Sequence, residues 1–182
     1  MKFKKFLLGI LFLQGSLMSA EVKHIKIDDI KVPVIFEKQT SIPTLNLQLV
    51  FRNSGYIQDK DKSGLVNLSS KLLNEGTKQL GSTKFAQKLE ENAISIHSAN
   101  GFETFVIELS NLKDVTNKAM KLLTKLLKSP NYSDEVLSKL KTIQIGTLKR
   151  KESDYDYTAK NLLKATLFKN TPLQNPSSGT IE

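Results

Sequence analysis

The stretch Gly64-Leu65-Val66-Asn67-Leu68-Ser69-Ser70-Lys71-Leu72-Leu73-Asn74-Glu75-Gly76-Thr77 has the periodicity of an amphipathic helix. Its leucines recur at the helical spacing of about 100° per residue and form one apolar face. Asn67, Ser70 and Lys71 lie on the opposite face. Because residues three and four positions apart are neighbours on a helix surface, these three side chains converge on one patch. The stretch therefore predicts a helix that packs its leucines inward and presents a small polar cluster.

The same spacing occurs in an H-x-x-E-H helix, where two histidines bind zinc and a glutamate activates the attacking water. The stretch resembles that helix in the pitrilysin/insulinase family of zinc peptidases, which includes the mitochondrial processing peptidases. Members typically read G-L-x-H-x-x-E-H-x-x-x-x-G-T, and Gly64, Leu65, Gly76 and Thr77 stand where this pattern places them. The resemblance implies an N-terminal domain of the pitrilysin/LuxS-like type.

The residues that would carry the family's chemistry are replaced. Asn67 and Lys71 stand at the two histidine positions and Ser70 at the glutamate position. The family's third metal ligand, a glutamate on a later helix, corresponds to Thr147. Zinc requires His, Cys or carboxylate donors, and a protonated lysine adds positive charge where the cation would sit. We therefore expect no zinc cofactor and no peptidase activity. Read without the resemblance, the cluster is the solvated face of an ordinary helix.

No other catalytic or metal site is indicated. The two histidines, His24 and His97, have no partner at ligand spacing, and the chain contains no cysteine. Disulfides and thiolate metal sites are therefore excluded. The sequence shows no Ser/His/Asp arrangement that would support an active hydrolase of another type.

The N-terminus predicts export. Basic residues precede an apolar run from Phe6 to Phe12, and small and polar residues then lead to Ala20. This order is typical of a secretory signal peptide, here residues 1–20, with a retained membrane anchor as the alternative. Its removal takes away three lysines and no acid, so the formal charge falls from +9 to +6. An exported chain without cysteine suits a bacterial periplasm, with membrane contact only through the signal peptide before cleavage.

The positive charge does not by itself indicate nucleic acid. A basic domain can bind phosphates, but no aromatic stripe accompanies the lysines and the export signal points away from the cytoplasm. We expect no nucleic-acid partner and interpret most lysines as solvated helix faces.

Alternating and helical patterns together predict an α+β domain with a mainly antiparallel sheet and helices packed on one face. Period-two alternation predicts strands at residues 22–27, 32–37, 43–51, 94–98 and 102–109. The last two form a hairpin at Asn100-Gly101. Helical periodicity predicts helices in the stretch 64–77, at residues 82–91, from about Asp114 to a stop at Ser129-Pro130, and from Ser133 towards Arg150. A last helix carries Ala159 to Leu167. Ser63 is the expected cap of the first helix.

Further landmarks extend the resemblance from about Val32 to the end of the chain. The segment Ser129-Pro130-Asn131-Tyr132 resembles the family's connector between two helices, and Gly179-Thr180 its later G-T segment. The resemblance implies that residues 21–182 are a truncated N-terminal peptidase-like domain. Such a domain would be marginally stable alone and would associate with another chain.

The resemblance also suggests what function remains. In the family, an extended peptide adds to an edge strand through backbone hydrogen bonds, which need no metal. Ser98-Ala99 is the matching pair here, although a strand that only pairs inside the sheet is the alternative. We expect a non-catalytic, peptide-binding protein or a partner subunit of an active zinc-peptidase homologue. The competing interpretations are a truncated or vestigial fragment with a structural role, and a residual metallopeptidase whose site the missing half completes.

Overall fold

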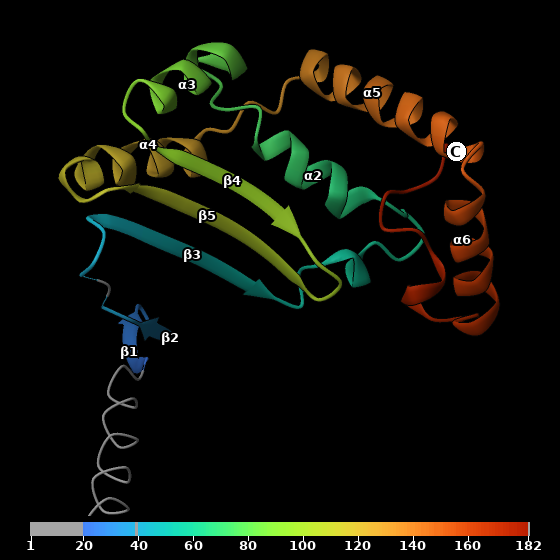
Figure 1. The fold of residues 1–182 in the computed structure, drawn as a ribbon, viewed down its shortest axis with the longest axis horizontal. Helices are drawn as coiled ribbons and strands as arrows, with labels where there is room; N and C mark the ends of the chain where they lie inside the picture. Colours follow the sequence, from blue (N-terminus) through green and yellow to red (C-terminus); the bar gives the residue numbers. More distant parts are fainter. Residues whose placement is uncertain (1–19, 39, 182) are drawn as a thin grey trace, which may run out of the picture. The chain divides into compact units, whose positions relative to one another are not determined.

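The computed structural model describes residues 20–38 and 40–181 (Figure 1). The predicted signal peptide therefore lies outside the described residues, apart from Ala20. Within the described part of the chain, no helix combines the length and hydropathy needed to cross a membrane. The chain divides into two compact units, with the boundary after Pro43.

The first unit is a β-hairpin. Strands β1 (Glu21–Ile27) and β2 (Ile30–Phe36) pair antiparallel, with His24 opposite Pro33. Asp28, in the connecting turn, has a positive φ of 51°, a conformation that Asp tolerates in tight turns. Both predicted strands are confirmed, with bounds shifted by one or two residues.

The second unit contains a three-stranded antiparallel sheet in the order β3-β5-β4. Its strands are β3 (Thr44–Arg52), β4 (Ser95–Asn100) and β5 (Thr104–Leu112). The predicted hairpin is confirmed, but its turn lies later than Asn100-Gly101. Asn100 is the last residue of β4 and pairs with Phe105. The Gly101 N–H donates to the Thr104 carbonyl at 2.8 Å, so the chain reverses at Phe102 and Glu103. β4 and β3 each have β5 as their strand partner, so both are edge strands of this sheet.

Helices pack on the sheet and extend beyond one end of it (Figure 1). They are α2 (Leu65–Leu73), α3 (Gly81–Glu90), α4 (Thr116–Lys128), α5 (Asp134–Glu152) and α6 (Tyr155–Leu167). Short 3₁₀ turns lie at η2 (Tyr56–Gln58), η3 (Lys113–Val115) and η4 (Pro172–Gln174). The α+β class and the five predicted helices are confirmed, although α2 ends at Leu73 and not near Thr77.

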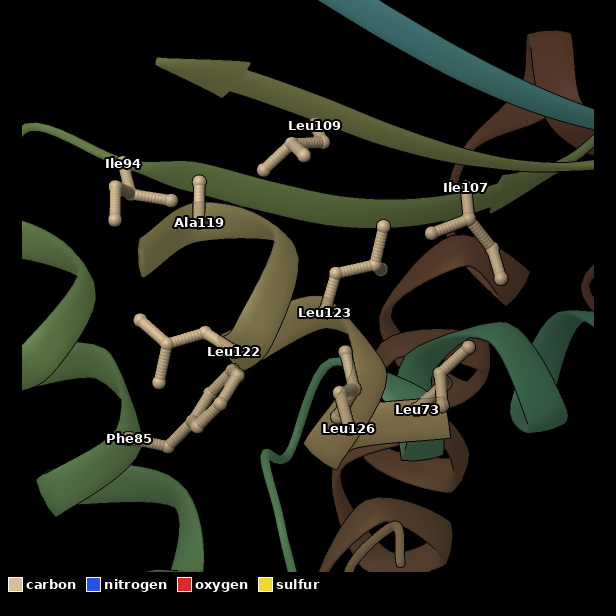
Figure 2. Close-up of a cluster of buried hydrophobic side chains, with 9 residues drawn as sticks. All are labelled: Leu73, Phe85, Ile94, Ile107, Leu109, Ala119, Leu122, Leu123 and Leu126. Carbon is tan, nitrogen blue, oxygen red and sulfur yellow. The ribbon is translucent and has the colours of Figure 1, made fainter. Parts of the chain in front are cut away.

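The core lies between the sheet and the helices (Figure 2). Leu109 of β5, which is 1% exposed, is among the buried side chains that face α4. The cluster comprises Leu73, Phe85, Ile94, Ile107, Leu109, Ala119, Leu122, Leu123 and Leu126. On the other face of the sheet, Gln48 donates to the Glu108 carboxylate at 2.9 Å. One apolar and one largely polar face explain why helices cover a single side, as the sequence predicts.

The predicted cap of α2 is wrong. Ser63 donates its hydroxyl to the Pro176 carbonyl at 2.8 Å, a contact to the later chain. The carboxylate of Asp59, which is 6% exposed, instead accepts from the N–H groups of Gly64 and Val66 at 2.8 Å each. Gly64 precedes the helix with a φ of 89°, so the chain turns sharply there and brings Asp59 beneath the first turn.

Candidate functional site

The polar face of α2 lies against the end of β4. The Asn67 Nδ2 donates to the Asn100 Oδ1 at 3.4 Å. Ser70, 4% exposed, has its hydroxyl 3.1 Å from the same Asn100 oxygen and 2.9 Å from the Asn67 carbonyl. The fold therefore brings together Asn67 and Ser70, two of the four positions at which the zinc motif is replaced. Both form hydrogen bonds between neutral groups, with β4 or with their own helix.

Lys71 points towards α5 instead. Its ammonium donates to the Gln144 Oε1, and the Gln144 Nε2 donates to the Ser178 carbonyl at 2.7 Å. Burial lowers the pKa of Lys71, and the positive charge of Lys151 lowers it further. A chain of hydrogen bonds thus joins α2, α5 and the segment that follows η4.

Thr147 is turned to its own helix. Its hydroxyl donates to the Ile143 carbonyl at 2.9 Å and accepts from Arg150 at 3.2 Å. The α5 residue that contacts the polar face of α2 is Gln144, three positions earlier. Sequence reasoning missed Gln144, although its spacing of three from Thr147 places both on neighbouring positions of one helix face.

These residues do not fit a zinc ion. The amide of Asn67, the hydroxyl of Ser70 and the ammonium of Lys71 replace two imidazoles and a carboxylate, and an ammonium repels a dication. Over residues 20–38 and 40–181, no three His, Cys, Asp or Glu side chains gather as a metal site would need. His24 lies in β1 and His97 is paired with Glu108 on the polar face of the sheet. At the four motif positions the chain thus carries an amide, two hydroxyls and an ammonium in place of two imidazoles and two carboxylates.

A second set of hydrogen bonds joins the end of α2 to Ser98 of β4. The Asn74 Oδ1 accepts from the Ser98 N–H at 2.7 Å, and the Asn74 Nδ2 donates to the Ser98 carbonyl at 3.0 Å. The buried Ser98 hydroxyl donates to the Ser70 carbonyl at 2.7 Å. Asn74 thus presents one donor and one acceptor to one residue of a strand, as a neighbouring peptide group would.

The hairpin fixes which backbone groups of β4 face outward. Gly101 bonds to Thr104 across the turn, and such bonds recur at every second residue of an antiparallel pair. His97 and Ala99 therefore direct their backbone groups to β5, whereas those of Ile96, Ser98 and Asn100 face the open edge. Of the predicted peptide-binding pair, Ser98 faces the edge but is bonded to Asn74, and Ala99 faces the sheet.

The motif residues that the chain retains have structural roles. Gly64 and Gly179 both have positive φ values, of 89° and 84°, and their backbones touch. A Cβ on Gly64 would lie 2.6 Å from the Gly179 Cα. Thr77, 3% exposed, forms bridges with Gly81 and Pro130, which hold the connector between α4 and α5 against the end of α2. The scaffold around the site is thus built by residues other than those that would perform chemistry.

Glu75 is the acidic group beside this helix end. Its carboxylate accepts from Ser82 at 2.5 Å and pairs with Lys139 at 3.2 Å. Burial raises the pKa of Glu75, but the Ser82 hydroxyl and the Lys139 ammonium outweigh it and leave the pKa below its ordinary value. Glu75 is therefore held as a carboxylate that ties α2 to α3 and α5.

The known proteins reported below that this chain resembles are peptidases or homologues of peptidases. A curated protein of Helicobacter pylori named "Non-peptidase homolog YmxG" is 43% identical over 180 residues, covering 98% of this chain and 42% of the relative. The chain thus spans less than half of that relative's length.

Two solved structures share the fold. A structure described as a peptidase M16 inactive domain from Pseudomonas fluorescens superposes with a TM-score of 0.78 at 22% identity, over 87% of this chain and 38% of that one. A protease from Helicobacter pylori superposes with a TM-score of 0.73 at 12% identity, over 90% of this chain and 39% of that one. The model of the insulinase family, peptidase family M16, matches residues 34–181. This chain belongs to that family.

Proposed function

We propose that this non-catalytic M16-type chain holds an extended peptide along the open edge of β4 without cleaving it. The observation that supports this proposal is the pair of hydrogen bonds between the Asn74 side chain and the Ser98 backbone, at 2.7 and 3.0 Å. An amide group already occupies this edge in the geometry of a neighbouring strand, so a peptide amide fits there. Without the zinc ligands or the base, the bound peptide stays intact.

The arrangement makes Asn74 a competitor of the peptide. Ile96 and Asn100 offer outward backbone groups on either side of Ser98, but the middle pair becomes available only when the Asn74 side chain rotates away. Asn74 is solvent-exposed apart from this contact, so rotation meets no packed core. Replacing Asn74 with alanine removes the competing amide and should tighten peptide binding.

Fluorescence anisotropy with a labelled, extended eight-residue peptide tests this proposal. Asn74→Ala is expected to lower the Kd by about threefold to tenfold, the equivalent of about one net hydrogen bond. Peptides N-methylated at alternate residues give the control, because one register loses the edge hydrogen bonds and the other keeps them. Equal affinity for the two N-methylated peptides, or unchanged affinity in Asn74→Ala, would refute edge-strand pairing.

The second candidate function is that of a partner subunit, and it is favoured by solvent-exposed apolar side chains on α6. Leu162, Leu163 and Leu167 are 68%, 57% and 66% exposed. Such a stripe favours association with another chain, and we propose an active zinc-peptidase homologue as the partner. Sedimentation of the mixture should show a complex that Leu162→Gln/Leu167→Gln weakens. A monomer whose sedimentation and unfolding ignore the homologue would leave the vestigial or structural alternative.

Export is proposed on the N-terminal sequence alone. The mature protein should begin near Glu21 and occur in the periplasmic fraction. Recovery of intact Met1 protein in the cytosol would contradict it.

A further inference from the structure

A cavity of about 350 Å³ opens between the end of α5, α6 and the segment after η4. Its lining includes Lys151, Tyr157, Lys160, Lys164, Pro176 and Ser178. This volume lies at the small end of ligand pockets, which measure about 300–1,000 Å³. None of the lining residues belongs to α2 or β4, so the proposed peptide edge does not use the cavity.

Three lysines from two helices converge on the cavity. Lys160 and Lys164 are one turn apart on α6, and the Lys151 ammonium, at the end of α5, lies 4.8 Å from the centre of the Tyr157 ring. Within residues 20–38 and 40–181, none of the three forms an ion pair, and Asp156 on the same helix pairs with none of them. Like charges one helical turn apart repel each other, so an anion in the cavity would relieve this repulsion.

Neutral groups complete the lining. The Tyr157 and Ser178 hydroxyls lie 3.0 Å apart, so one donates to the other and the remaining hydroxyl hydrogen can turn towards an occupant. Leu163, Pro176 and the Tyr157 ring supply an apolar wall. The cavity therefore combines cationic and hydroxyl donors with a surface for an organic group.

The cavity is also linked to the polar cluster of α2. Ser178 accepts from Gln144, which in turn accepts from Lys71. The pKa of Lys71 is lowered first by burial and then by the charge of Lys151, which lines the cavity. An anion beside Lys151 would offset that charge and raise the pKa of Lys71.

We propose that this cavity binds a small organic phosphate, with its phosphate group among Lys151, Lys160 and Lys164 and its organic part against Leu163 and Pro176. A phosphate monoester carries close to two negative charges at neutral pH and presents tetrahedrally arranged oxygens. Lysine binds phosphate as a point charge, whereas planar carboxylates are matched best by arginine, which is absent from the lining.

Calorimetric titration of the full chain with phenyl phosphate tests the site. Inorganic phosphate, benzoate and phosphatidylglycerol vesicles are the comparison probes. We expect phenyl phosphate to bind more tightly than inorganic phosphate, because of the apolar wall, and more tightly than benzoate, because of its charge. Lys160→Gln/Lys164→Gln should raise its Kd by about tenfold or more.

The matched control is Lys121→Gln/Lys125→Gln, which removes the same charge from the exposed face of α4. It should change the Kd by less than about twofold. Tyr157→Phe keeps the ring and should weaken binding by about threefold to tenfold. Equal effects of the two double variants, equal affinity for benzoate, or no saturation at millimolar phenyl phosphate would each overturn the proposal. So would vesicle binding that requires Lys160 and Lys164 when phenyl phosphate does not bind.

Discussion

Asp59 provides the sharpest stability test, because one buried carboxylate fixes the start of the helix on which the site is built. Both of its oxygens accept backbone N–H groups at 2.8 Å, from Gly64 and Val66. Asp59→Ala leaves these two donors without a partner in the protein. Loss of an N-terminal cap costs about 0.5–2 kcal/mol, hydrogen bonds to a charged group about 1.5–3 kcal/mol each, and the lost interaction with the helix dipole about 0.3–1 kcal/mol.

These effects overlap, since they describe the same contacts, and water can reach part of the opened site. We expect a net loss of about 2–4 kcal/mol in the free energy of unfolding. With a urea m-value of about 2 kcal/mol/M, the unfolding midpoint falls by about 1–2 M. Circular dichroism in urea measures this directly.

Ser63→Ala is the matched control, because Ser63 is the residue that sequence rules select as the cap. It loses only the hydroxyl bond to the Pro176 carbonyl, worth about 1 kcal/mol. A Ser63→Ala variant as unstable as Asp59→Ala, or an Asp59→Ala variant within about 0.5 kcal/mol of the parent, would show that the capping geometry is misjudged.

Three further predictions test the scaffold, the site and the pH response. Gly146→Ala should stabilise the chain by about 0.5–1 kcal/mol, because Gly146 lies in a helix interior and a Cβ there meets nothing within 4 Å. Gly64→Ala should destabilise the chain by more than this, because the new Cβ would lie 2.6 Å from the Gly179 Cα. Urea unfolding compares the two variants. Asn67→His/Ser70→Glu/Lys71→His should bind zinc weakly at best in equilibrium dialysis, because Thr147 supplies no carboxylate, and robust peptidase activity would contradict the assignment. The pKa of Glu75 is lower in the folded chain than in the unfolded chain, so its contribution to stability is present above the unfolded pKa of about 4.3 and is lost as pH falls through the folded pKa. In unfolding experiments between about pH 3 and 7, Glu75→Gln should therefore lose less stability on acidification than the parent chain. An unchanged pH dependence would exclude this role.

Local pattern was sufficient for most of the fold. Period-two alternation predicted the strands, and the Asn100-Gly101 signal predicted the β4–β5 hairpin, because both signals depend on neighbouring residues only. The turn itself lies at Phe102 and Glu103, since Asn100 is still paired in β4. The cap of α2 could not be found this way. Ser63 has the preferred residue type next to the helix, but the left-handed turn at Gly64 redirects the chain and makes Asp59 the residue within reach.

In the candidate site, too, the sequence predicts what lies on one helix but not which residues of other elements contact it. The replacement of Asn67, Ser70 and Lys71 is visible in one helical stretch, because helix spacing alone puts them together. Their partners come from β4 and α5, and only the folded chain brings Asn100 and Gln144 to them. The cavity beside α6 was likewise invisible, since its lining comes from α5, α6 and a later loop.

The hydrogen-bond partners of the replaced residues bear on whether this site is simply defunct. A buried polar group without a partner costs about 1–3 kcal/mol, so random replacement of zinc ligands would be expected to leave unsatisfied atoms. Here Ser70, Asn67 and Lys71 each have a partner on another element or on their own helix. The cluster therefore joins α2 to β4 and α5, a structural role that a chain without catalytic activity still requires. The Ser98 hydroxyl also lies 3.0 Å from the Asn74 Oδ1. A double-mutant cycle between Asn74→Ala and Ser98→Ala should therefore give a coupling of about 0.5–1.5 kcal/mol, and a coupling near zero would mean that this side-chain contact adds nothing to the two bonds between Asn74 and the Ser98 backbone.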